Sequence, residues 1–471
     1  MAMMTGDQYR ESLKDGRVTF IEGERCDDPS THPLLKTAVD VAAGIYDKLY
    51  KPDPDAYSPI FWIPQSKEEM QQRQEALRGA ADMTSGTTSV SVMAIAMAAP
   101  ELAKANPVYR ERIYNYIDYC RKNDLRLAET VTDAKGNRKL RPTQQHDPDQ
   151  YLHVVDRTPD GVYVRGCKMH ISAASIEHEL VIFPTKSMRP GEEAYAFGGA
   201  VPVNAPGVTI INTTYAPHDE DKRHYPVSSR RNTPEGFVVF DDVFVPNERI
   251  WLDGETEYAG TLASALGLWE RTAGGAMQPR EAEDRLVGLA ALMAEANGVA
   301  NEPHIQDKLA TLMIFATMCR AGHEAAWANA TTNEDGNLIP STIFISATKY
   351  YQHELEDRMV DILHDIAGTM VTNAPTMADF EHPDLRPGLE KLLETPGFTA
   401  EERLKLYHYI RDTTADALGG WSSVTGKQAG GGQFAQRMVT ARNYDMERAK
   451  AIARRTVGIG QEALATGKEG A

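Results

Sequence analysis

The chain has 471 residues, of which 50 are Lys or Arg and 67 are Asp or Glu, so its formal net charge is −17. Nucleic acid and anionic membranes do not attract a protein this acidic, and we expect neither as its main partner. Hydrophobic residues make up 42% and charged residues 25% of the sequence, as in a folded globular protein. At roughly 150 residues per domain, the length suggests about three domains.

The sequence does not indicate a membrane-spanning or secreted protein. No apolar run approaches the roughly 18 residues that span a bilayer, and residues 1–17 are charged, with no signal-peptide core. The cysteines lie far apart, without a CxxC pair or nearby histidines, at positions Cys26, Cys120, Cys167 and Cys319. We therefore expect a cytoplasmic protein without disulfides or a metal site, in which each cysteine is a small buried side chain.

Residues 1–142 carry mainly helical patterns. Thr5 and Gln8 can cap a first short helix, and residues 33–49 place apolar side chains at nearly helical intervals. A proline-rich stretch, residues 51–65, interrupts the pattern. The helical spacing then returns over residues 67–81, 89–99 and 107–122. We expect an N-terminal helical domain over residues 1–142.

The pattern changes to strands and then back to helices. From Tyr151 to Ile250 the apolar period drops to two and turn signals such as TPDG recur, which predicts a β domain over residues 143–254. From about Glu255 the helical period returns, which predicts a helical bundle over residues 255–471. This α+β order resembles the layout of acyl-CoA dehydrogenase-like flavoproteins, with a β-barrel between two helical domains. Such a layout leaves a crevice for a flat cofactor between barrel and helices.

Five sequence strings at the boundaries between these regions show a more specific resemblance. They are TDAKGNRKLRP (132–142), EGFVVFDDVFVPNERI (235–250), ANGVANEPHIQDKL (296–309), DIAGTMVTNAPT (365–376) and GQFAQRMVTARNYDMERAKAIA (432–453). Across almost the whole chain they resemble the superfamily of 4-hydroxyphenylacetate 3-hydroxylases and 4-hydroxybutyryl-CoA dehydratases. The residues of the first string and of the bundle segments are more similar to those of the dehydratase branch.

The resemblance implies a non-covalently bound FAD between the barrel and the C-terminal helices, in a homotetramer built as a dimer of dimers. Its best candidates for flavin contacts lie in the first string. Side chains there can donate hydrogen bonds to flavin carbonyls or the pyrophosphate, namely Thr132, Lys135, Asn137 and Arg138. Composition alone would favour a charged turn between domains.

Two further candidates end a strand at what the resemblance implies is the flavin edge. The hydroxyl of Ser172 can hydrogen-bond the N5 region, and His170 can donate or carry a proton near neutral pH. A surface histidine on an alternating strand is the alternative, and His178 has a weaker claim.

Glycines mark two more segments. Gly368 breaks a helix where the resemblance implies contact with the FAD pyrophosphate or ADP portion, often across a subunit interface, although a helix C-cap is an equal alternative. Residues 421–433 hold four glycines, which predicts a flexible loop, and this loop resembles the one that lines the flavin and substrate cavity in the superfamily.

The sequence departs from the dehydratases at their iron–sulfur cluster. Two cysteines, a histidine and a further cysteine hold that cluster, and the aligned positions here are Thr87, Ser91, Glu270 or Arg271, and Gln278. Because none is a cysteine or histidine, we expect no iron–sulfur cluster and no cluster-dependent dehydration.

The sequence also departs from the hydroxylases. They place an Arg, a Tyr and a His against the phenol substrate, and the counterparts here are Thr87, Ser91 and Glu129. A threonine and a serine four residues apart share one helical face and leave a small neutral surface, so we do not expect 4-hydroxyphenylacetate as the substrate. Glu129 is the candidate general base if it is buried beside flavin, and a solvated carboxylate otherwise.

These observations predict a monooxygenase of the two-component type, which uses O2 and FADH2 from a separate reductase to hydroxylate an aromatic or heteroaromatic compound. The absence of a GxGxxG motif after a predicted strand agrees with this, since the protein would not bind NAD(P)H. A cluster-free isomerase or dehydrogenase acting on a CoA thioester is the alternative, and a non-catalytic flavin-binding protein is the third. The choice between FAD and FMN stays open.

Overall fold

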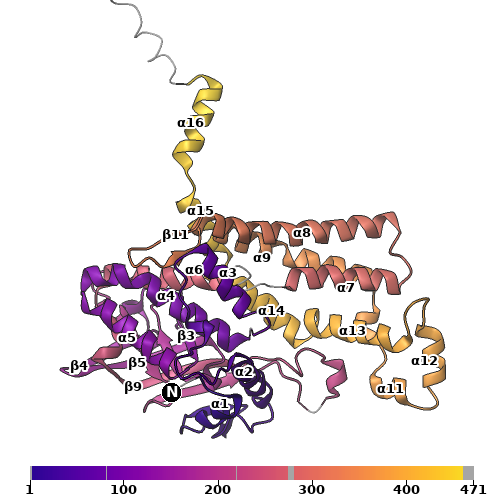
Figure 1. The fold of residues 1–471 in the computed structure, drawn as a ribbon, viewed down its shortest axis with the longest axis horizontal. Helices are drawn as coiled ribbons and strands as arrows, with labels where there is room; N and C mark the ends of the chain where they lie inside the picture. The colour runs from indigo at the N-terminus through magenta and orange to yellow at the C-terminus, as the bar shows by residue number, and fades with distance from the viewer. Residues whose placement is uncertain (1–2, 81, 219, 274–280, 460–471) are drawn as a thin grey trace, which may run out of the picture.

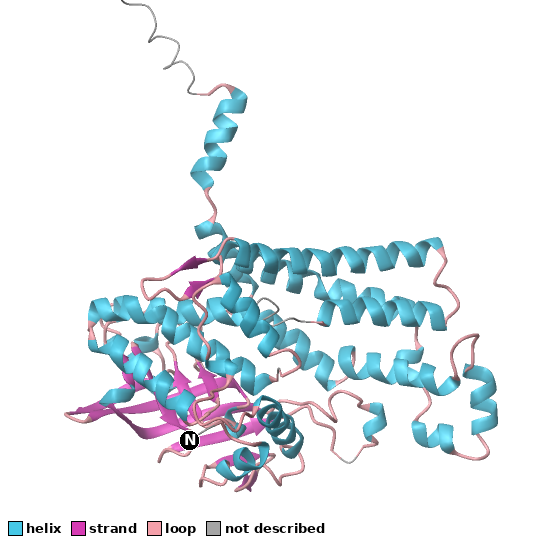
Figure 2. Ribbon diagram, in the orientation of Figure 1, coloured by secondary structure: helices cyan, strands magenta, loops and turns pink. Residues whose placement is uncertain are grey.

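The computed structural model describes residues 3–80, 82–218, 220–273 and 281–459. Two sheets lie at one end of the molecule, and long helices cover them and extend beyond them (Figures 1 and 2). The chain order is helices, then strands, then helices again, as the sequence predicts. Among the described residues, no helix is long and apolar enough to cross a membrane.

The N-terminal helices follow the predicted spacing closely. Their bounds are α1 Gly6–Ser12, α2 Lys36–Leu49, α3 Lys67–Ala76, α4 Met83–Ala105 and α5 Val108–Lys122. Thr5 and Gln8 form the predicted capping box at α1. Helix α4 begins six residues before the predicted position because Asp82 caps it through the backbone N–H of Ser85.

Three short strands in this stretch were not predicted, namely β1 Thr19–Ile21, β2 Glu24–Cys26 and β3 Leu127–Thr130. Each has only three or four residues, which is too short to show a period of two. Strand β1 pairs in parallel with β8, and β3 pairs in parallel with β6. The N-terminal part of the chain therefore supplies strands to both sheets.

The remaining strands of the two sheets follow in order. They are β4 His153–Thr158, β5 Gly161–Ser172, β6 Glu179–Ile182, β7 Phe197–Pro202, β8 Val208–Thr213, β9 Glu235–Pro246 and β10 Ile250–Asp253. One sheet has the order β2-β1-β8-β9-β5-β4 and the other β10-β7-β6-β3. Valine and isoleucine side chains from both sheets share one buried core. In the long β5–β9 pair, Ser172 lies opposite Glu235.

The C-terminal region is the predicted helical bundle. Its helices are α6 Thr256–Ala273, α7 Ala282–Ala296, α8 Pro303–Ala328, α9 Thr342–Ala367, α10 Met370–Asn373, α11 Met377–Glu381, α12 Arg386–Leu393, α13 Ala400–Thr414, α14 Ala417–Gln428, α15 Gln433–Asn443 and α16 Met446–Val457. A small hairpin, β11 Thr331–Thr332 and β12 Leu338–Ile339, separates α8 from α9. Helices α4, α5 and α6 share a core with β6, β7 and β10, so the bundle is continuous with the sheets.

Short 3-10 turns connect many of these elements. They are η1 Pro59–Phe61, η2 Pro142–Gln144, η3 Pro148–Gln150, η4 Ala174–Ile176, η5 Glu193–Tyr195, η6 Lys222–His224 and η7 Asn247–Arg249.

The prediction of a flexible loop over residues 421–433 is wrong for most of that segment. Helix α14 continues to Gln428, and two of its glycines, Gly419 and Gly426, serve close packing. A Cβ on Gly419 would lie 2.5 Å from the backbone of Thr414, and one on Gly426 would lie 2.8 Å from the ring of His353. Only the turn after α14 uses glycine for its conformation, with Gly430 and Gly431 at φ of 73° and 79°.

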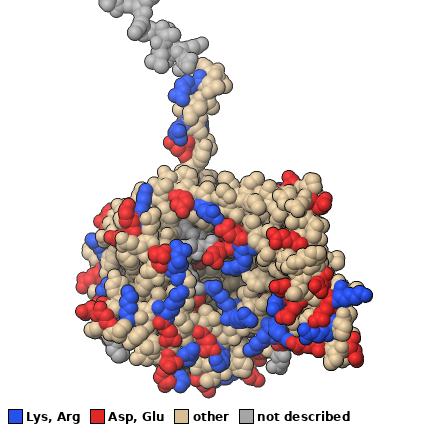
Figure 3. All heavy atoms as spheres, turned by 45° about the vertical axis from the view of Figure 1, so that its right-hand side comes forward, with Lys and Arg blue, Asp and Glu red and all other residues tan. Residues whose placement is uncertain are grey.

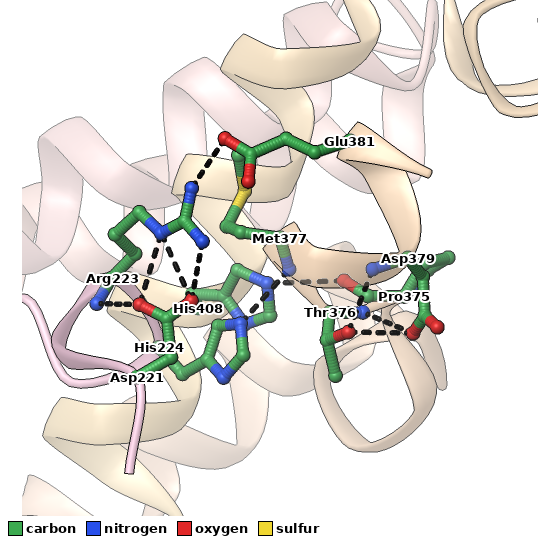
Figure 4. A network of polar contacts seen from close by, with 9 residues as sticks. All are labelled: Asp221, Arg223, His224, Pro375, Thr376, Met377, Asp379, Glu381 and His408. Carbon is green, nitrogen blue, oxygen red and sulfur yellow. Dashed lines mark hydrogen bonds and ion pairs between the residues drawn. The ribbon is translucent and has the colours of Figure 1, made fainter. Parts of the chain in front are cut away.

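A polar contact joins the segment around η6 to the bundle (Figure 4). The backbone N–H of Met377 donates to Nε2 of His224 at 2.9 Å, and the ring of His224 lies 4.7 Å from that of His408. Nε2 of His408 lies 3.2 Å from the carbonyl oxygen of Pro375. Nearby, Asp412 accepts hydrogen bonds from Ser228, at 3.0 Å from its N–H and 2.6 Å from its hydroxyl.

This contact requires neutral histidines. Nε2 of His224 accepts a hydrogen bond, so it must carry a lone pair and not a proton. If both rings were protonated, their positive charges would repel each other at this short distance. Burial, then the neighbouring His224, lowers the pKa of His408 to about 4, and burial lowers the pKa of His224 as well. The charged groups that face the two rings are Asp221, Arg223, Asp379 and Arg411.

We expect acid to destabilise this contact. An unfolded histidine takes up its proton near pH 6.5, so the stability present above that pH is lost as the pH falls towards about 4. The loss due to His408 is up to about 2 kcal/mol at pH 5. It is measured as the difference between the free energies of unfolding in urea at pH 7.5 and pH 5.

The matched variants are His408→Gln, which removes the titrating ring, and His146→Gln, which changes an exposed histidine elsewhere. We expect a smaller pH dependence for the first and the wild-type dependence for the second. Equal pH dependence in His408→Gln and the wild type would contradict the assignment.

Candidate functional site

The predicted substrate-binding residues lie on α4, next to β3. The hydroxyl of Thr88 accepts a hydrogen bond from the backbone N–H of Leu127 at 2.9 Å, which fastens the helix to the strand. Thr87 donates to Oε1 of Glu177 at 3.0 Å. Ser91 is buried, and its hydroxyl has no hydrogen-bond partner in the part of the chain that the structure describes. Thr87 is thus committed to a protein carboxyl, and Ser91 is available.

The candidate base Glu129 forms a pair that the sequence did not predict. Glu129 lies on β3 and Glu270 lies on α6, and their side chains are hydrogen-bonded to each other. Oε2 of Glu270 also accepts the backbone N–H of Gly430 at 2.9 Å. Both side chains lie deep in the fold yet keep partial solvent exposure, so they border an internal space. The alternative of a solvated helix-end carboxylate does not describe Glu129.

The two carboxyls have unequal surroundings. Burial, then the charge of Glu270, raises the pKa of Glu129 well above its usual value. Burial also raises the pKa of Glu270, but four groups oppose the rise: the Glu129 hydrogen bond, the Gly430 N–H, and the charges of Lys349 and Arg271. Glu129 is therefore the member of the pair that more readily holds a proton.

A buried lysine holds the loop that follows β3. Nζ of Lys168 donates to the carbonyl oxygens of Val131 at 2.8 Å and Phe183 at 3.0 Å, and it forms an ion pair with Asp133 at 2.8 Å. The backbone N–H of Met169 donates to the carbonyl of Thr132 at 2.7 Å. The loop with Thr132 is thereby fixed against the end of β5.

Cations gather beside this loop. Burial, then the charges of Lys135 and Arg138, lowers the pKa of His170, and burial followed by the charge of Arg138 lowers the pKa of Lys135. Among the described residues, neither Lys135 nor Arg138 has an ion-pair partner. Asn137 instead orders the turn, because its side-chain oxygen accepts the backbone N–H of Lys139 at 3.1 Å. The predicted residues Lys135, Arg138 and His170 therefore lie together, next to Thr132.

The basic group of Lys135 and Arg138 contrasts with the acidic composition of the whole chain. Figure 3 shows acidic and basic side chains interspersed over one face, which is hollowed near its centre. The net charge of −17 is therefore not gathered into one acidic patch on this face.

Ser172 lies at the predicted strand end but already has a partner. Its hydroxyl lies 2.9 Å and 3.0 Å from the two carboxylate oxygens of Glu235, and the indole N–H of Trp421 donates to Glu235 at 2.9 Å. Burial raises the pKa of Glu235 to about 7, although the hydrogen bonds from Ser172 and Trp421 oppose the rise. Glu235 and Trp421 thus join the sheet to α14, and the sequence did not single out either residue for this role.

Gly368 lies away from the carboxyl pair within one chain. It ends α9 with φ of 76°, and its N–H donates to the carbonyl of His364 at 2.7 Å, which is a helix C-cap. Lys349, which faces Glu270, lies 19 residues earlier on the same helix, or about 28 Å at 1.5 Å per residue. The cofactor role of Gly368 stays a prediction that requires a second subunit.

The other candidate residues have structural surroundings. His178 is buried, with Nδ1 2.9 Å from the backbone N of Arg126 and Nε2 2.8 Å from the hydroxyl of Ser12. Burial, then the charge of Arg17, lowers its pKa to about 3, so it is a neutral core histidine. All four cysteines are buried, as expected. Gln278 lies outside the described residues, within which no group of His, Cys, Asp and Glu side chains could hold a metal ion.

Comparison with known families gives matches over nearly the whole chain. The model described as "4-hydroxyphenylacetate 3-hydroxylase N terminal" matches residues 5–252, and the one described as "4-hydroxyphenylacetate 3-hydroxylase C terminal" matches residues 259–458.

Two curated relatives represent both branches of the predicted superfamily. The oxygenase component of 4-hydroxyphenylacetate 3-monooxygenase from Thermus thermophilus is 30% identical over 430 residues, which are 88% of this chain and 89% of that protein. The 4-hydroxybutyryl-CoA dehydratase/vinylacetyl-CoA-Delta-isomerase from Clostridium aminobutyricum is 26% identical over 496 residues, which are 97% of this chain and 100% of that protein.

Solved structures confirm the predicted fold. The oxygenase component of 4-hydroxyphenylacetate 3-monooxygenase complexed with FAD has a TM-score of 0.86 at 28% identity, covering 98% of this chain and 99% of that one. An oxygen-tolerant archaeal 4-hydroxybutyryl-CoA dehydratase from N. maritimus has the same TM-score at 24% identity, covering 97% and 95%, and shows a shared fold.

Proposed function

Because the chain belongs to the 4-hydroxyphenylacetate 3-hydroxylase family, we propose that it is a flavin-dependent monooxygenase that hydroxylates an aromatic or heteroaromatic small molecule. The observation that carries this proposal is the hydrogen-bonded pair of Glu129 and Glu270, which sets an acid–base group at an internal space. General acid–base groups of this kind, with pKa values shifted by burial, are typical of active sites.

The residues present fit FAD. Lys135 and Arg138 gather positive charge and have no ion-pair partner in the described chain, so a diphosphate would supply the missing negative charge. Thr132 lies in a loop that Lys168 holds rigid. Reduced FAD, when bound, would supply the electrons that activate O2. A relative named "FADH(2)-dependent monooxygenase TftD" from Burkholderia cepacia supports the reduced form.

The chain's own residues would bind the substrate and handle its proton. Ser91 offers a free hydroxyl on α4, and Glu129 offers a carboxyl on the neighbouring strand. Thr87 donates to Glu177 and so presents mainly its methyl group. Ser91, Glu129 and Thr87 include no cation that could pair with a substrate carboxylate. We therefore infer that the substrate is not 4-hydroxyphenylacetate.

An acyl-CoA reaction is the second candidate. Similarity to the dehydratase/isomerase from Clostridium aminobutyricum over 97% of this chain supports a flavoenzyme that isomerises or dehydrogenates a CoA thioester. A non-catalytic flavin-binding protein is the third, and the carboxyl pair argues against it because such a pair is costly to bury without use.

Hydroxylation of phenols distinguishes these candidates. With FADH2 generated by an added reductase, we expect the protein to consume oxygen and form hydroxylated product with at least one uncharged phenol, and Glu129→Gln to lower the rate by about 10²- to 10⁴-fold. The measurements are product analysis and oxygen uptake. No product from a broad phenol panel, together with saturable binding of an acyl-CoA, would favour the second candidate.

The basic group allows a direct test of the cofactor site. We expect Lys135→Ala and Arg138→Ala each to weaken FAD binding about tenfold, because each removes a charge that would face the diphosphate. The matched control is Lys139→Ala, a neighbouring exposed lysine. Fluorescence titration of the flavin measures all three. Equal affinity in all three variants would place the diphosphate elsewhere.

We also propose a separate reductase, a cytoplasmic location and a homotetramer. The relatives named oxygenase components support the reductase, and the four free buried cysteines support a reducing compartment. Exposed apolar side chains support assembly with further copies of this chain. They are Met313, Ile314 and Met318 on α8 and Met446, Ile452 and Val457 on α16.

Helix α16 is the element that most needs a surface to pack on. It projects away from the rest of the molecule (Figure 1), and 44% to 66% of its apolar side chains Met446, Ile452 and Val457 is exposed. An isolated helix of 12 residues is marginal in water, so it needs a surface to pack on. We assign that surface to a second copy of the chain.

Serine substitutions test this assembly. We expect Ile452→Ser to weaken the tetramer, because it removes apolar contact area, and Lys450→Ser on the same helix to leave assembly unchanged. Sedimentation velocity over a range of protein concentrations measures the shift to smaller species. A wild-type protein that sediments as a monomer would contradict the proposal.

A further inference from the structure

The pair of Glu129 and Glu270 brings together carboxyls that lie 141 residues apart in the sequence. Two ionised carboxylates have only acceptor oxygens and repel each other at this range. A hydrogen bond between them therefore requires one proton. The pair carries that proton and one net negative charge.

The surroundings place the proton on Glu129. Glu270 accepts the N–H of Gly430 and faces the positive charges of Lys349 and Arg271, all of which favour its ionised form. The charged side chains that act on Glu129 are the carboxyls of Glu270 and Glu177, which favour its protonated form. Glu129 therefore donates to Glu270 through one oxygen, and its second oxygen is left for the internal space.

We propose that Glu129 and Glu270 act as one acid–base unit that holds a single proton, and that this unit receives the hydroxyl proton of an uncharged phenolic substrate. The substrate part rests on the proposed function. Glu129 would touch the substrate and is the catalytic residue, whereas Glu270 acts through Glu129 and is a positioning residue.

The proton transfer is balanced within the site. As the ring is oxygenated by O2 and reduced flavin, the substrate O–H bond breaks and its electron pair stays on the phenolic oxygen. The substrate proton passes to the free oxygen of Glu129, and the proton of Glu129 passes to Glu270. The substrate gains one negative charge, and the pair loses one. No further acid or base is needed for this step.

The charge of the pair selects the substrate class. A phenol that is already ionised at neutral pH would bring a negative oxygen to a pair of net charge −1. Such repulsion in a buried site disfavours binding strongly. We therefore expect uncharged phenols to bind, and phenols with electron-withdrawing groups to bind less as the pH rises through their own pKa.

Gly430 completes the unit. Its φ of 73° and a Cβ position only 2.6 Å from Cγ of Arg271 leave no room for a side chain. The backbone can therefore approach Glu270 closely enough to donate its N–H. This close approach explains why a glycine stands at position 430 in the turn between α14 and α15.

Infrared difference spectroscopy tests the shared proton without turnover. The wild type should show the C=O stretch of a protonated carboxyl at neutral pH that is absent from Glu129→Gln. It should also be absent from Glu270→Gln, because Glu129 loses the neighbour that keeps it protonated. Glu257→Gln, an exposed glutamate on the same helix α6, should keep the band.

The outcomes separate the proposals. A band that persists in Glu270→Gln would mean that burial alone protonates Glu129, which overturns the shared unit. A wild type without the band overturns it too. Since this measurement needs no substrate, the unit can be established even if no phenol is hydroxylated, and that second result would count against the proposed function alone.

A double-mutant cycle tests the catalytic role. If the two carboxyls act as one unit, Glu129→Gln, Glu270→Gln and the double variant should each lower kcat by a similar factor, about 10²- to 10⁴-fold. Glu270→Asp should recover part of the rate. Multiplicative losses in the double variant would show that the residues act separately and would overturn the proposal.

Discussion

The amine of Lys168 makes the contact on which the site depends. It binds Asp133 and the carbonyl oxygens of Val131 and Phe183, so it joins the loop after β3 to the ends of β5 and β6. A buried ammonium is stable only when its donors are satisfied, and removing one partner of a buried ion pair costs about 3–5 kcal/mol. This contact therefore fixes the register of β3, and β3 in turn sets Glu129 opposite α6.

Polar side chains also join the sheets to the C-terminal helices. Glu129 meets Glu270 at one point, and Ser172, Glu235 and Trp421 meet at another. Apolar packing alone would allow the sheets and the bundle to slide, because it has little directional preference. Hydrogen bonds to buried carboxyls allow only one arrangement, since a displaced carboxyl would lose its partners inside the protein. The contact between sheets and helices is therefore held in one arrangement where chemistry is proposed.

The sequence predicted those features that depend on neighbours in the chain. The capping box of Thr5 and Gln8 and the long helices need only local patterns, and the structure confirms them. Strand β3 is four residues long and is specified by its pairing with β6, so its own pattern could not reveal it. Glu270 or Arg271 aligns with a cluster ligand of the dehydratases, but the contact of Glu270 with Glu129 depends on folding. The glycines of α14 indicated a loop because their packing partners, such as His353, lie far away in sequence.

The missing cluster ligands and the carboxyl pair have one physical explanation. Thr87, Ser91 and either Glu270 or Arg271 stand where the resemblance places ligands of an iron–sulfur cluster, and thiolates are needed to hold one. Two ionised carboxylates in contact inside the protein would repel each other at high cost. Two carboxyls that share one proton avoid this cost, because the pair buries one charge instead of two and satisfies it with Gly430, Arg271 and Lys349. The same fold can thus hold a carboxyl pair in the region where the dehydratases hold a metal cluster.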